Sequence, residues 1–329
     1  WLKKDPSIRL VSISQNDNEN YCKCEKCAAI DALEGSHMGT LLRVVNAVAE
    51  DIKDDYPEVA IETLAYRYTR NVPKITKPLP NVIIRLCSFE ACFTHPLESG
   101  ACSRNRAYVK DLEEWNRVCD RIYIWDYATN FAHYLAPYPN FNSIRNNMRF
   151  YADHGVKGMY PEGNYQSISG EFAELRAYML ARLAWEPMMS ESIYNIHINR
   201  FLEHYYGKGW RNIRAFLDWF NATAKARHIS IYERPLWTIS KETYETVYDA
   251  IESWWDAAER DAGDKIENVK RSRLQWTYVS LMVRPNEEKA RAFYKDVNNR
   301  GIRWKEDAYT LLEELNFAGD PADWVFKKQ

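Results

Sequence analysis

Four acidic residues stand at or just after the ends of predicted β-strands in the first half of the sequence. They are Asp17, Glu90, Asp126 and Glu162. If the strands are parallel, their carboxyl ends meet at one edge, and the four carboxylates point toward one rim. Cleavage of a glycosidic bond needs two carboxyl groups, one protonated to act as an acid and one ionised to act as a base or nucleophile. The pattern therefore favours a shared acidic site, although single acids in such places often pair with arginines or cap helices.

Polar and aromatic residues accompany these acids and could bind a sugar. Aromatic rings offer flat apolar faces for stacking, whereas amide and guanidinium groups bond to hydroxyl and carboxylate oxygens. The candidate binding residues are Asn16, Tyr66, Arg67, Trp125, Tyr127, Asn130, Tyr160, Asn164 and Tyr165. Trp125 and Tyr127 directly flank Asp126. Asp126 and Glu162 are therefore the first catalytic candidates.

Three cysteines lie close together after the first predicted strand, in the motif CxCxxC. Cys22, Cys24 and Cys27 could bind a structural zinc ion if a fourth ligand came from elsewhere. The candidates for that ligand are Cys92, Cys102 and His95. Two alternatives stay open: a disulfide, for example from Cys102 to one of the three in an exported protein, or reduced thiols without a metal. No other cofactor is indicated.

The first half of the sequence alternates strand and helix patterns. The predicted strands cover Arg9–Ser14, Val59–Tyr66, Asn81–Leu86, Arg121–Tyr127 and Val156–Pro161. The predicted helices cover 38–54, 105–119, 142–154 and 171–185. This alternation predicts a parallel sheet, either in a (β/α)₈ barrel or in a doubly wound sheet.

An α/β barrel of the TIM type is the favoured fold. The turn after the first strand, QNDNE, lacks the glycine-rich phosphate turn of doubly wound folds, and polar residues close the strands. Only five of the eight strands of a barrel are recognisable. We therefore expect the sequence to hold the later strands, with the N-terminal part of the barrel missing, and its start at Trp1 rather than Met agrees.

The chain changes character near residue 190. Helical patterns without strand alternation run through 191–206, 210–226, 240–261, 265–283, 287–298 and 303–316. Ser240 is a predicted helix start, and Pro285 is a predicted break. The sequence therefore predicts a catalytic barrel part over residues 1–189 and an all-helical C-terminal domain over residues 190–329.

The composition argues against two classes of protein. A net charge of −2 lacks the basic excess of a nucleic-acid-binding protein. No stretch approaches the roughly 18 consecutive apolar residues of a membrane-spanning helix. The aromatic content of 14% fits a large helical core, and it also fits rings that stack on sugars.

Several segments resemble a bacterial family of glycoside-hydrolase-like barrel domains of uncharacterised function, related to α-glucuronidases. They are VSISQNDNENYCKCEKC, IETLAY, SFE with its following cysteine, IYIWDY and VKGMYPEGN. The later stretches LRAYMLARLAWEP and FLEHYYG resemble the family as well, so the likeness covers roughly residues 8–207. Its most specific parts are NDN…CxCxxC and WDY.

This resemblance implies an exported protein, in the periplasm, at the cell surface or outside the cell, although no signal peptide is present in this sequence. It also implies action on a glycan. α-Glucuronidases are inverting enzymes with the acid on an earlier strand and bases on later strands. By position along the barrel, the resemblance implies Asp17 or Glu90 as the general acid and Asp126 or Glu162 as the base.

The leading functional expectation is a glycoside hydrolase of α-glucuronidase-like type, acting on a complex or acidic glycan. One alternative is a barrel that binds a glycan without cleaving it. Another is a metal-dependent hydrolase that uses the rim acids with His95 or His133. The expected partner is a carbohydrate, and no pattern indicates an oligomeric state.

Overall fold

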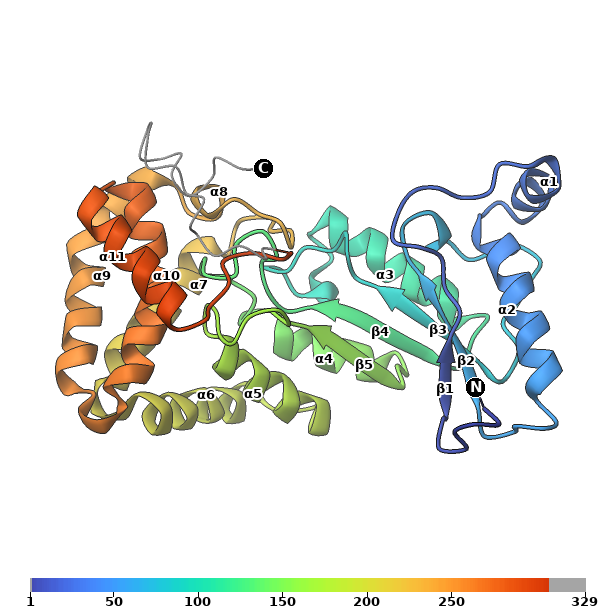
Figure 1. Ribbon diagram of the computed structural model, residues 1–329, viewed down its shortest axis with the longest axis horizontal. Coiled ribbons are helices and arrows are strands. Elements are labelled where there is room, and N and C mark those ends of the chain that lie inside the picture. The colour runs from blue at the N-terminus through green and yellow to red at the C-terminus, as the bar shows by residue number, and fades with distance from the viewer. Residues whose placement is uncertain (1, 308–329) are drawn as a thin grey trace. The chain divides into compact units, whose positions relative to one another are not determined.

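The structure, a computed structural model, describes residues 2–307 (Figure 1). The chain forms two compact units whose segments alternate along the sequence. Within the described residues, the first unit contains residues 2–91, 100–127 and 150–161. The second unit contains residues 92–99, 128–149 and 162–307, so the position predicted for a domain boundary, 189/190, lies inside it.

The first unit is built on a five-stranded sheet. Its strands are β1 (Leu10–Ser12), β2 (Ala60–Ala65), β3 (Val82–Cys87), β4 (Ile122–Tyr127) and β5 (Gly158–Glu162). They lie in the order β1-β2-β3-β4-β5, and β1 to β4 pair in parallel. A doubly wound sheet reverses the direction of strand addition at a switch point, whereas a barrel adds strands sequentially. The mixed α/β fold predicted from the sequence is therefore present, with a strand order that agrees with part of a barrel.

The register of the sheet decides which side chains share a face. Leu64 is aligned with Arg85, and Arg85 with Tyr123, so these three side chains lie on one face. Ile84 is aligned with Ile122 on the other face, where both are almost completely buried. Strand alternation thus divides the sheet into one mainly apolar face and one face that mixes charged and aromatic groups.

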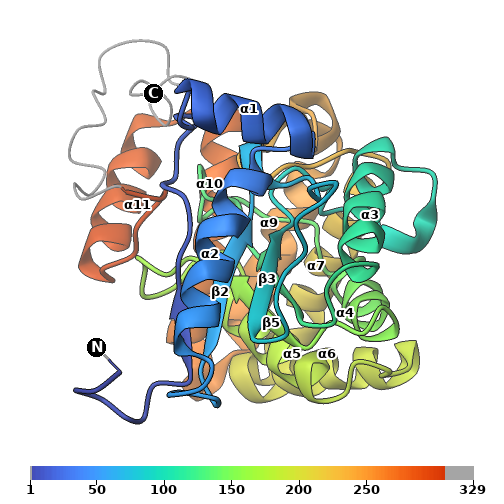
Figure 2. The same ribbon diagram turned by 90° about the vertical axis from the view of Figure 1, so that its right-hand side faces the viewer.

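Three helices accompany the sheet in the first unit: α1 (Glu25–Glu34), α2 (Met38–Ile52) and α3 (Ser103–Asn116). Figure 2 shows α2 beside β2 and β3, with α1 lying across its end. The stripe Met38, Leu42, Val45 and Ala49 repeats at helical spacing and is fully buried. The sequence predicts α2 and α3 but not α1, which begins inside the CxCxxC motif.

A buried carboxylate fixes the end of α1. Glu34 accepts hydrogen bonds from the backbone N–H groups of Ile75 and Thr76, at 2.9 and 3.0 Å, and from Arg43 at 2.8 Å. Burial opposes ionisation of this group, but the hydrogen bonds from Thr76 and its other donors outweigh burial and lower the pKa of Glu34 to about 2. Gly35 follows with φ of 67° and ends the helix in the left-handed conformation.

The second unit is helical. Its elements are α5 (Ala173–Trp185), α6 (Glu191–Tyr206), α7 (Trp210–Ala224), α8 (Pro235–Thr238), α9 (Lys241–Asp261), α10 (Ile266–Val283) and α11 (Glu287–Asn299), while α4 (Ile144–Asp153) begins in this unit and ends in the first. As predicted, Ser240 caps α9, accepting from the backbone of Thr243, and Pro285 separates α10 from α11. The predicted helix over 303–316 runs past the described residues, and its part at 303–307 is not helical.

The core of the helical region is aromatic. Trp255 and Trp276 are at most 1% exposed, and both pack near the ring of Phe216, with centroid distances of 5.4 and 6.5 Å. Packing between α7, α9 and α10 therefore accounts for much of the tryptophan in this part of the sequence. Among the described residues, no helix has both the length and the apolar character that crossing a membrane requires.

Candidate functional site

The loops that follow β1 and β2 are tied together by side chains at the carboxyl edge of the sheet. The amide of Gln15 donates to the carbonyl oxygen of Tyr66 at 2.8 Å, and its oxygen accepts from the Thr69 hydroxyl at 2.9 Å. Parallel strands place the residues that follow them at one edge, as the sequence predicts. These bonds hold the chain on both sides of Tyr66 and Arg67 in a fixed position.

Arg67 is the centre of this edge. Its guanidinium lies 5.0 Å from the ring centroids of both Tyr66 and Phe89. It also pairs with Glu19 at 2.9 Å and with Asp17 at 3.4 Å. The backbone of Arg67 has φ of 48°, a conformation that costs a non-glycine residue roughly 1–3 kcal/mol and recurs at functional sites.

The aromatic rings form one connected group around this arginine. Phe89 meets Tyr66 edge-on at 5.5 Å and Tyr127 at 6.0 Å between ring centroids. We call Tyr66, Arg67, Phe89 and Tyr127 the arginine–aromatic cluster. Burial raises the pKa of Tyr66 to about 12, so its hydroxyl stays protonated at neutral pH. Three of these four residues are predicted binding residues, and the structure brings them together with Asp17.

An open pocket of about 600 Å³ lies beside the loop after β1. A second pocket of about 330 Å³ shares five of its lining residues and is also lined by Asn16, another predicted binding residue. The shared residues are Tyr21, Cys22, Asp31, His37 and Tyr68. Both pockets belong to the first unit.

The pocket contains a histidine–carboxylate pair that the sequence does not reveal. Nδ1 of His37 is 2.6 Å from the carboxylate of Asp31, which also accepts from the Thr40 hydroxyl at 2.6 Å. The ring of Tyr21 stacks on His37 with 3.7 Å between centroids, and Tyr68 lies 5.6 Å from Tyr21. Aromatic rings beside hydrogen-bonding groups are suited to the mixed apolar and hydroxyl surface of a sugar.

Asp126 lies on the apolar face of the sheet, because it follows Ile122 and Ile124 at alternate positions of β4. It is buried and accepts a hydrogen bond of 2.6 Å from the hydroxyl of Ser88. Burial raises the pKa of Asp126 to about 6 in spite of that bond. Its negative charge also raises the pKa of Tyr108 on α3, whose own burial is the larger cause. Asp126 is thus placed inside the packing of sheet and helices.

Glu90 and Asp17 are exposed acids held by arginines. Glu90 pairs with Arg70, which also pairs with Asp111 of α3. Asp17 has a side chain that is 78% exposed, and it pairs with Arg67. Both residues therefore fit the alternative in which acids at strand ends pair with arginines.

Trp125 and Tyr160 are neighbours on the mixed face of the sheet. Their rings meet edge-on at 4.8 Å, and the guanidinium of Arg85 lies 5.8 and 5.9 Å from the two ring centroids. Arg85 is also paired with Glu62. Tyr160 is 42% exposed, so this pair of predicted binding residues presents an accessible ring surface.

The remaining predicted site residues belong to the second unit. Glu162 ends β5, is partly exposed, and accepts at its backbone oxygen from the N–H of Ala128 at 2.7 Å. Asn130 is buried and donates to the backbone of Glu233 at 2.6 Å. Asn164 is partly exposed and Tyr165 is 59% exposed, so both are accessible to a ligand of this unit. His133, a candidate of the metal-dependent alternative, is buried against the Tyr278 hydroxyl at 2.9 Å.

The thiols of Cys22, Cys24 and Cys27 lie within 4.8 Å of one another, and we call them the thiol loop. Cys22 Sγ is 3.5 Å from Cys24 Sγ. Hydrogen bonding to Cys22 and Cys24 raises the pKa of Cys27 to about 12, whereas the pKa of Cys24 is lowered by the backbone of Cys27. All seven cysteines lie within the described residues. Cys92, His95 and Cys102, expected as further ligands of this group, gather in a different group.

Comparisons with known proteins give a family and a similar solved structure. No curated protein matches the chain. A solved structure, described as a GH138 enzyme targeting pectin rhamnogalacturonan II, matches with a TM-score of 0.40 and 8% sequence identity. That match covers 82% of this chain, and the chain spans 59% of the length of that enzyme. A family model described as a domain of unknown function (DUF4838) matches residues 1–218 of the 329, and the chain therefore belongs to this family.

Proposed function

We propose that this protein is a glycoside hydrolase of α-glucuronidase-like type that acts on a complex or acidic glycan. The arginine–aromatic cluster beside the pocket is the observation that carries the proposal. Aromatic rings stack on the apolar faces of sugars, and a guanidinium binds a carboxylate with two parallel hydrogen bonds. Asp17 and Glu19, the present partners of Arg67, are exposed, and exposed ion pairs contribute little. The carboxylate of a uronic acid could therefore replace them.

Asp126 and Glu162 are the proposed acid and base. A general acid must hold a proton near the working pH, and burial raises the pKa of Asp126 to about 6. Glu162, in the second unit, is partly exposed, which suits a base that activates water. Asp17 and Glu90 are the second pair of candidates, and their arginine partners favour roles in binding.

Turnover of the full-length parent protein tests this assignment. Asp126→Asn and Glu162→Gln are expected to lower turnover of a cleaved glycan by roughly 10²–10⁴-fold while the affinity for the glycan stays the same. Ser88→Ala is the matched control: it removes the bond that lowers the pKa of Asp126, so the basic limb of the pH–rate profile should move to higher pH. Full activity of both carboxylate variants would overturn the assignment.

A non-catalytic glycan-binding protein is the second candidate. The pairing of Asp17 with Arg67 and of Glu90 with Arg70 favours it, because both acids are engaged in ion pairs. Both functions predict that Arg67→Ala weakens binding of galacturonate or glucuronate oligosaccharides at least tenfold, with binding of neutral oligosaccharides less affected. Arg9→Ala, at an exposed surface ion pair, is the control. Binding measured by calorimetry without hydrolysis of any tested glycan would select the second candidate.

Three further parts of the proposal concern the setting of this site. We propose that the five sequential strands belong to a (β/α)₈ barrel of the TIM type, and the strand order supports this. We propose that the thiol loop binds a structural zinc ion, supported by its three clustered thiols. An exported location is proposed from the family resemblance alone.

A further inference from the structure

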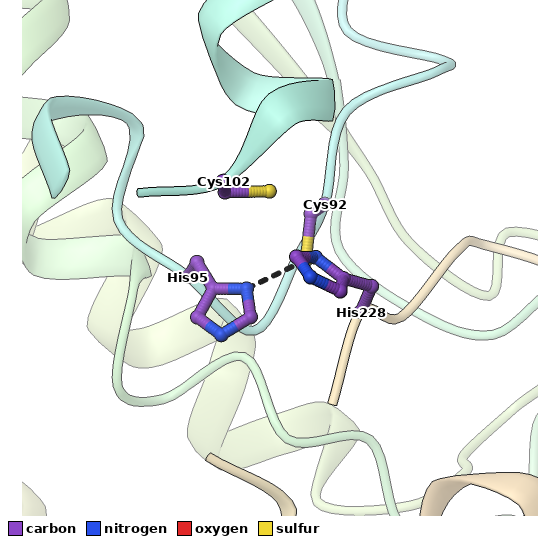
Figure 3. Close-up of side chains that lie close together, drawn as sticks. All are labelled: Cys92, His95, Cys102 and His228. Carbon is purple, nitrogen blue, oxygen red and sulfur yellow. Dashed lines mark hydrogen bonds between the residues drawn. The ribbon is translucent and has the colours of Figure 1, made fainter. Parts of the chain in front are cut away.

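A second group of metal-binding side chains is not used by the proposed function. It consists of Cys92, His95, Cys102 and His228, and we call it the cysteine–histidine cluster (Figure 3). Each residue offers one ligand atom, a thiol sulfur or a ring nitrogen, and the four atoms lie within 4.8 Å of one another. The proposal rests on Cys92, His95 and His228, which all belong to the second unit. Cysteine thiolates and histidine nitrogens are the usual ligands of zinc, and a further ligand or a water molecule completes a four-coordinate site.

Backbone and side-chain hydrogen bonds hold two of the ligand-bearing segments together. The N–H of Phe93 donates to the carbonyl oxygen of Ile229 at 3.0 Å, so the residues adjacent to Cys92 and His228 in sequence are paired. The Ser143 hydroxyl donates to the carbonyl oxygen of Phe93 at 2.6 Å. Further along, the N–H of Leu97 donates to the side chain of Asn147 at 3.0 Å. The segment that carries Cys92 and His95 is therefore fixed on both sides of His95.

The separations of the ligand atoms suit a tetrahedral ion. Cys92 Sγ is 3.2 Å from His95 Nδ1, and the rings of His95 and His228 are 4.8 Å apart between centroids. With zinc–sulfur and zinc–nitrogen bonds of about 2.3 and 2.0 Å, tetrahedral ligand atoms are roughly 3.3–3.8 Å apart. A contraction of about 1 Å brings the widest pair into that range. His228 is exposed and lies in the loop between α7 and α8.

Cys92 is buried, and its thiol would lose its proton on binding a cation.

We propose that the cysteine–histidine cluster is a structural zinc site that joins the segment following β3 to the loop that precedes α8. The site is independent of the proposed glycan chemistry. It is also separate from the thiol loop, because the structure gathers the two sets of ligands into different groups. The competing chemistry is a disulfide between Cys92 and Cys102, which would leave the two histidines without a metal.

Zinc content measured on the full chain tests the site. The variant with Cys22, Cys24 and Cys27 all changed to serine removes the thiol loop, and those residues are mostly exposed. This background, purified under reducing conditions with zinc present, is expected to retain about one zinc per chain by mass spectrometry of metals. Replacement of zinc by cobalt should then give the visible absorption of tetrahedral cobalt with sulfur ligands. Absence of zinc from this background would overturn the proposal.

Single substitutions in the same background locate the ion. His228→Ala and Cys92→Ser are each expected to lose the zinc and to lower the melting temperature to that of the chelator-treated parent. Cys119→Ser is the matched control, because Cys119 is a buried thiol outside both groups. His228 is exposed, so its variant keeps the test valid if Cys92→Ser does not fold. Zinc retained by His228→Ala, or a Cys92–Cys102 disulfide in peptides from alkylated protein, would contradict the proposal.

Discussion

Asp126 is buried yet ionisable, so its charge is linked to the stability of the fold. Burial raises its pKa to about 6 in the folded chain, compared with an ordinary value of 3.8. The folded state therefore binds this proton more tightly than the unfolded state does. The stability that comes from the protonated group is fully present below about pH 3.8 and is lost as the pH rises through 6.

Asp126→Asn should remove this pH dependence. Asparagine has a similar shape and can accept the Ser88 hydrogen bond without ionising. Compared with the natural protein, the variant should gain stability between about pH 4 and pH 7, approaching about 3 kcal/mol at neutral pH. Urea unfolding at several pH values measures the difference. Glu58→Gln, at an exposed carboxylate, is the control. If the stability difference between Asp126→Asn and the natural protein does not change with pH, the titration of Asp126 is not linked to folding.

Side-chain direction limits what the sequence could predict about the site. Parallel strands bring Asn16, Asp17, Tyr66 and Arg67 to one edge, and this followed from their positions after the strands. The segment IYIWDY is apolar or aromatic on both faces, so its pattern did not show that Asp126 shares the apolar face. Similarly, the contact between Asp31 and His37 depends on a turn between two helices.

At the scale of elements, the sequence predicted the helices and strands whose apolar residues repeat at a regular spacing. The five strands are runs of β-branched and aromatic residues bounded by polar turns, and their predicted ends differ from those in the structure by at most two residues. The buried stripe of α2 made that helix equally clear. In α1, Leu33 is 59% exposed and the helix buries little apolar surface, so its sequence lacked that signal. Its CxCxxC motif was interpreted as a loop instead.

The close packing of α1 against α2 leads to a prediction for Gly39. A Cβ atom at this position would lie 2.2 Å from Cγ of Glu34, whose carboxylate is fixed by its hydrogen bonds. Gly39→Ala should destabilise the protein by about 1–3 kcal/mol, although alanine favours helix by about 1 kcal/mol. Val44→Ala, at an exposed position of α2, should change stability by about 0.5 kcal/mol or less. Denaturant unfolding compares the two, and a stabilised Gly39→Ala protein would show that the helices separate easily.

At the scale of the whole molecule, the segments of the two units alternate along the sequence, so cutting the chain at one point does not separate the units. A piece ending at residue 189 keeps α5 but loses α6 and α7. The Tyr194 hydroxyl, on α6, donates to the carbonyl oxygen of Phe141 at 2.9 Å, and Phe172 meets Phe216 of α7 at 6.3 Å. The sequence predicted most of the helices after residue 190, but the return of the chain to the same unit depends on distant contacts that no local pattern encodes.

The fragment 1–189 should therefore be incompletely folded. Its buried rings at Phe141 and Phe172 would be exposed to solvent without α6 and α7. Limited proteolysis is expected to cut the fragment within 128–149 and 162–189, where the full chain resists, and near-ultraviolet circular dichroism should lose intensity. A protease-resistant fragment with a native-like aromatic spectrum would instead establish residues 1–189 as an independent domain.

The hydrogen bond between Phe93 and Ile229 has a consequence for how the chain is made. Ile229 follows Phe93 by 136 residues (93 to 229), and a ribosome adds roughly 5–20 residues per second. The segment with Cys92 is therefore synthesised roughly 7–27 s before its partner. During that interval its thiol and apolar side chains are open to oxidants and chaperones, so the order of synthesis exposes the very residues that the finished protein buries.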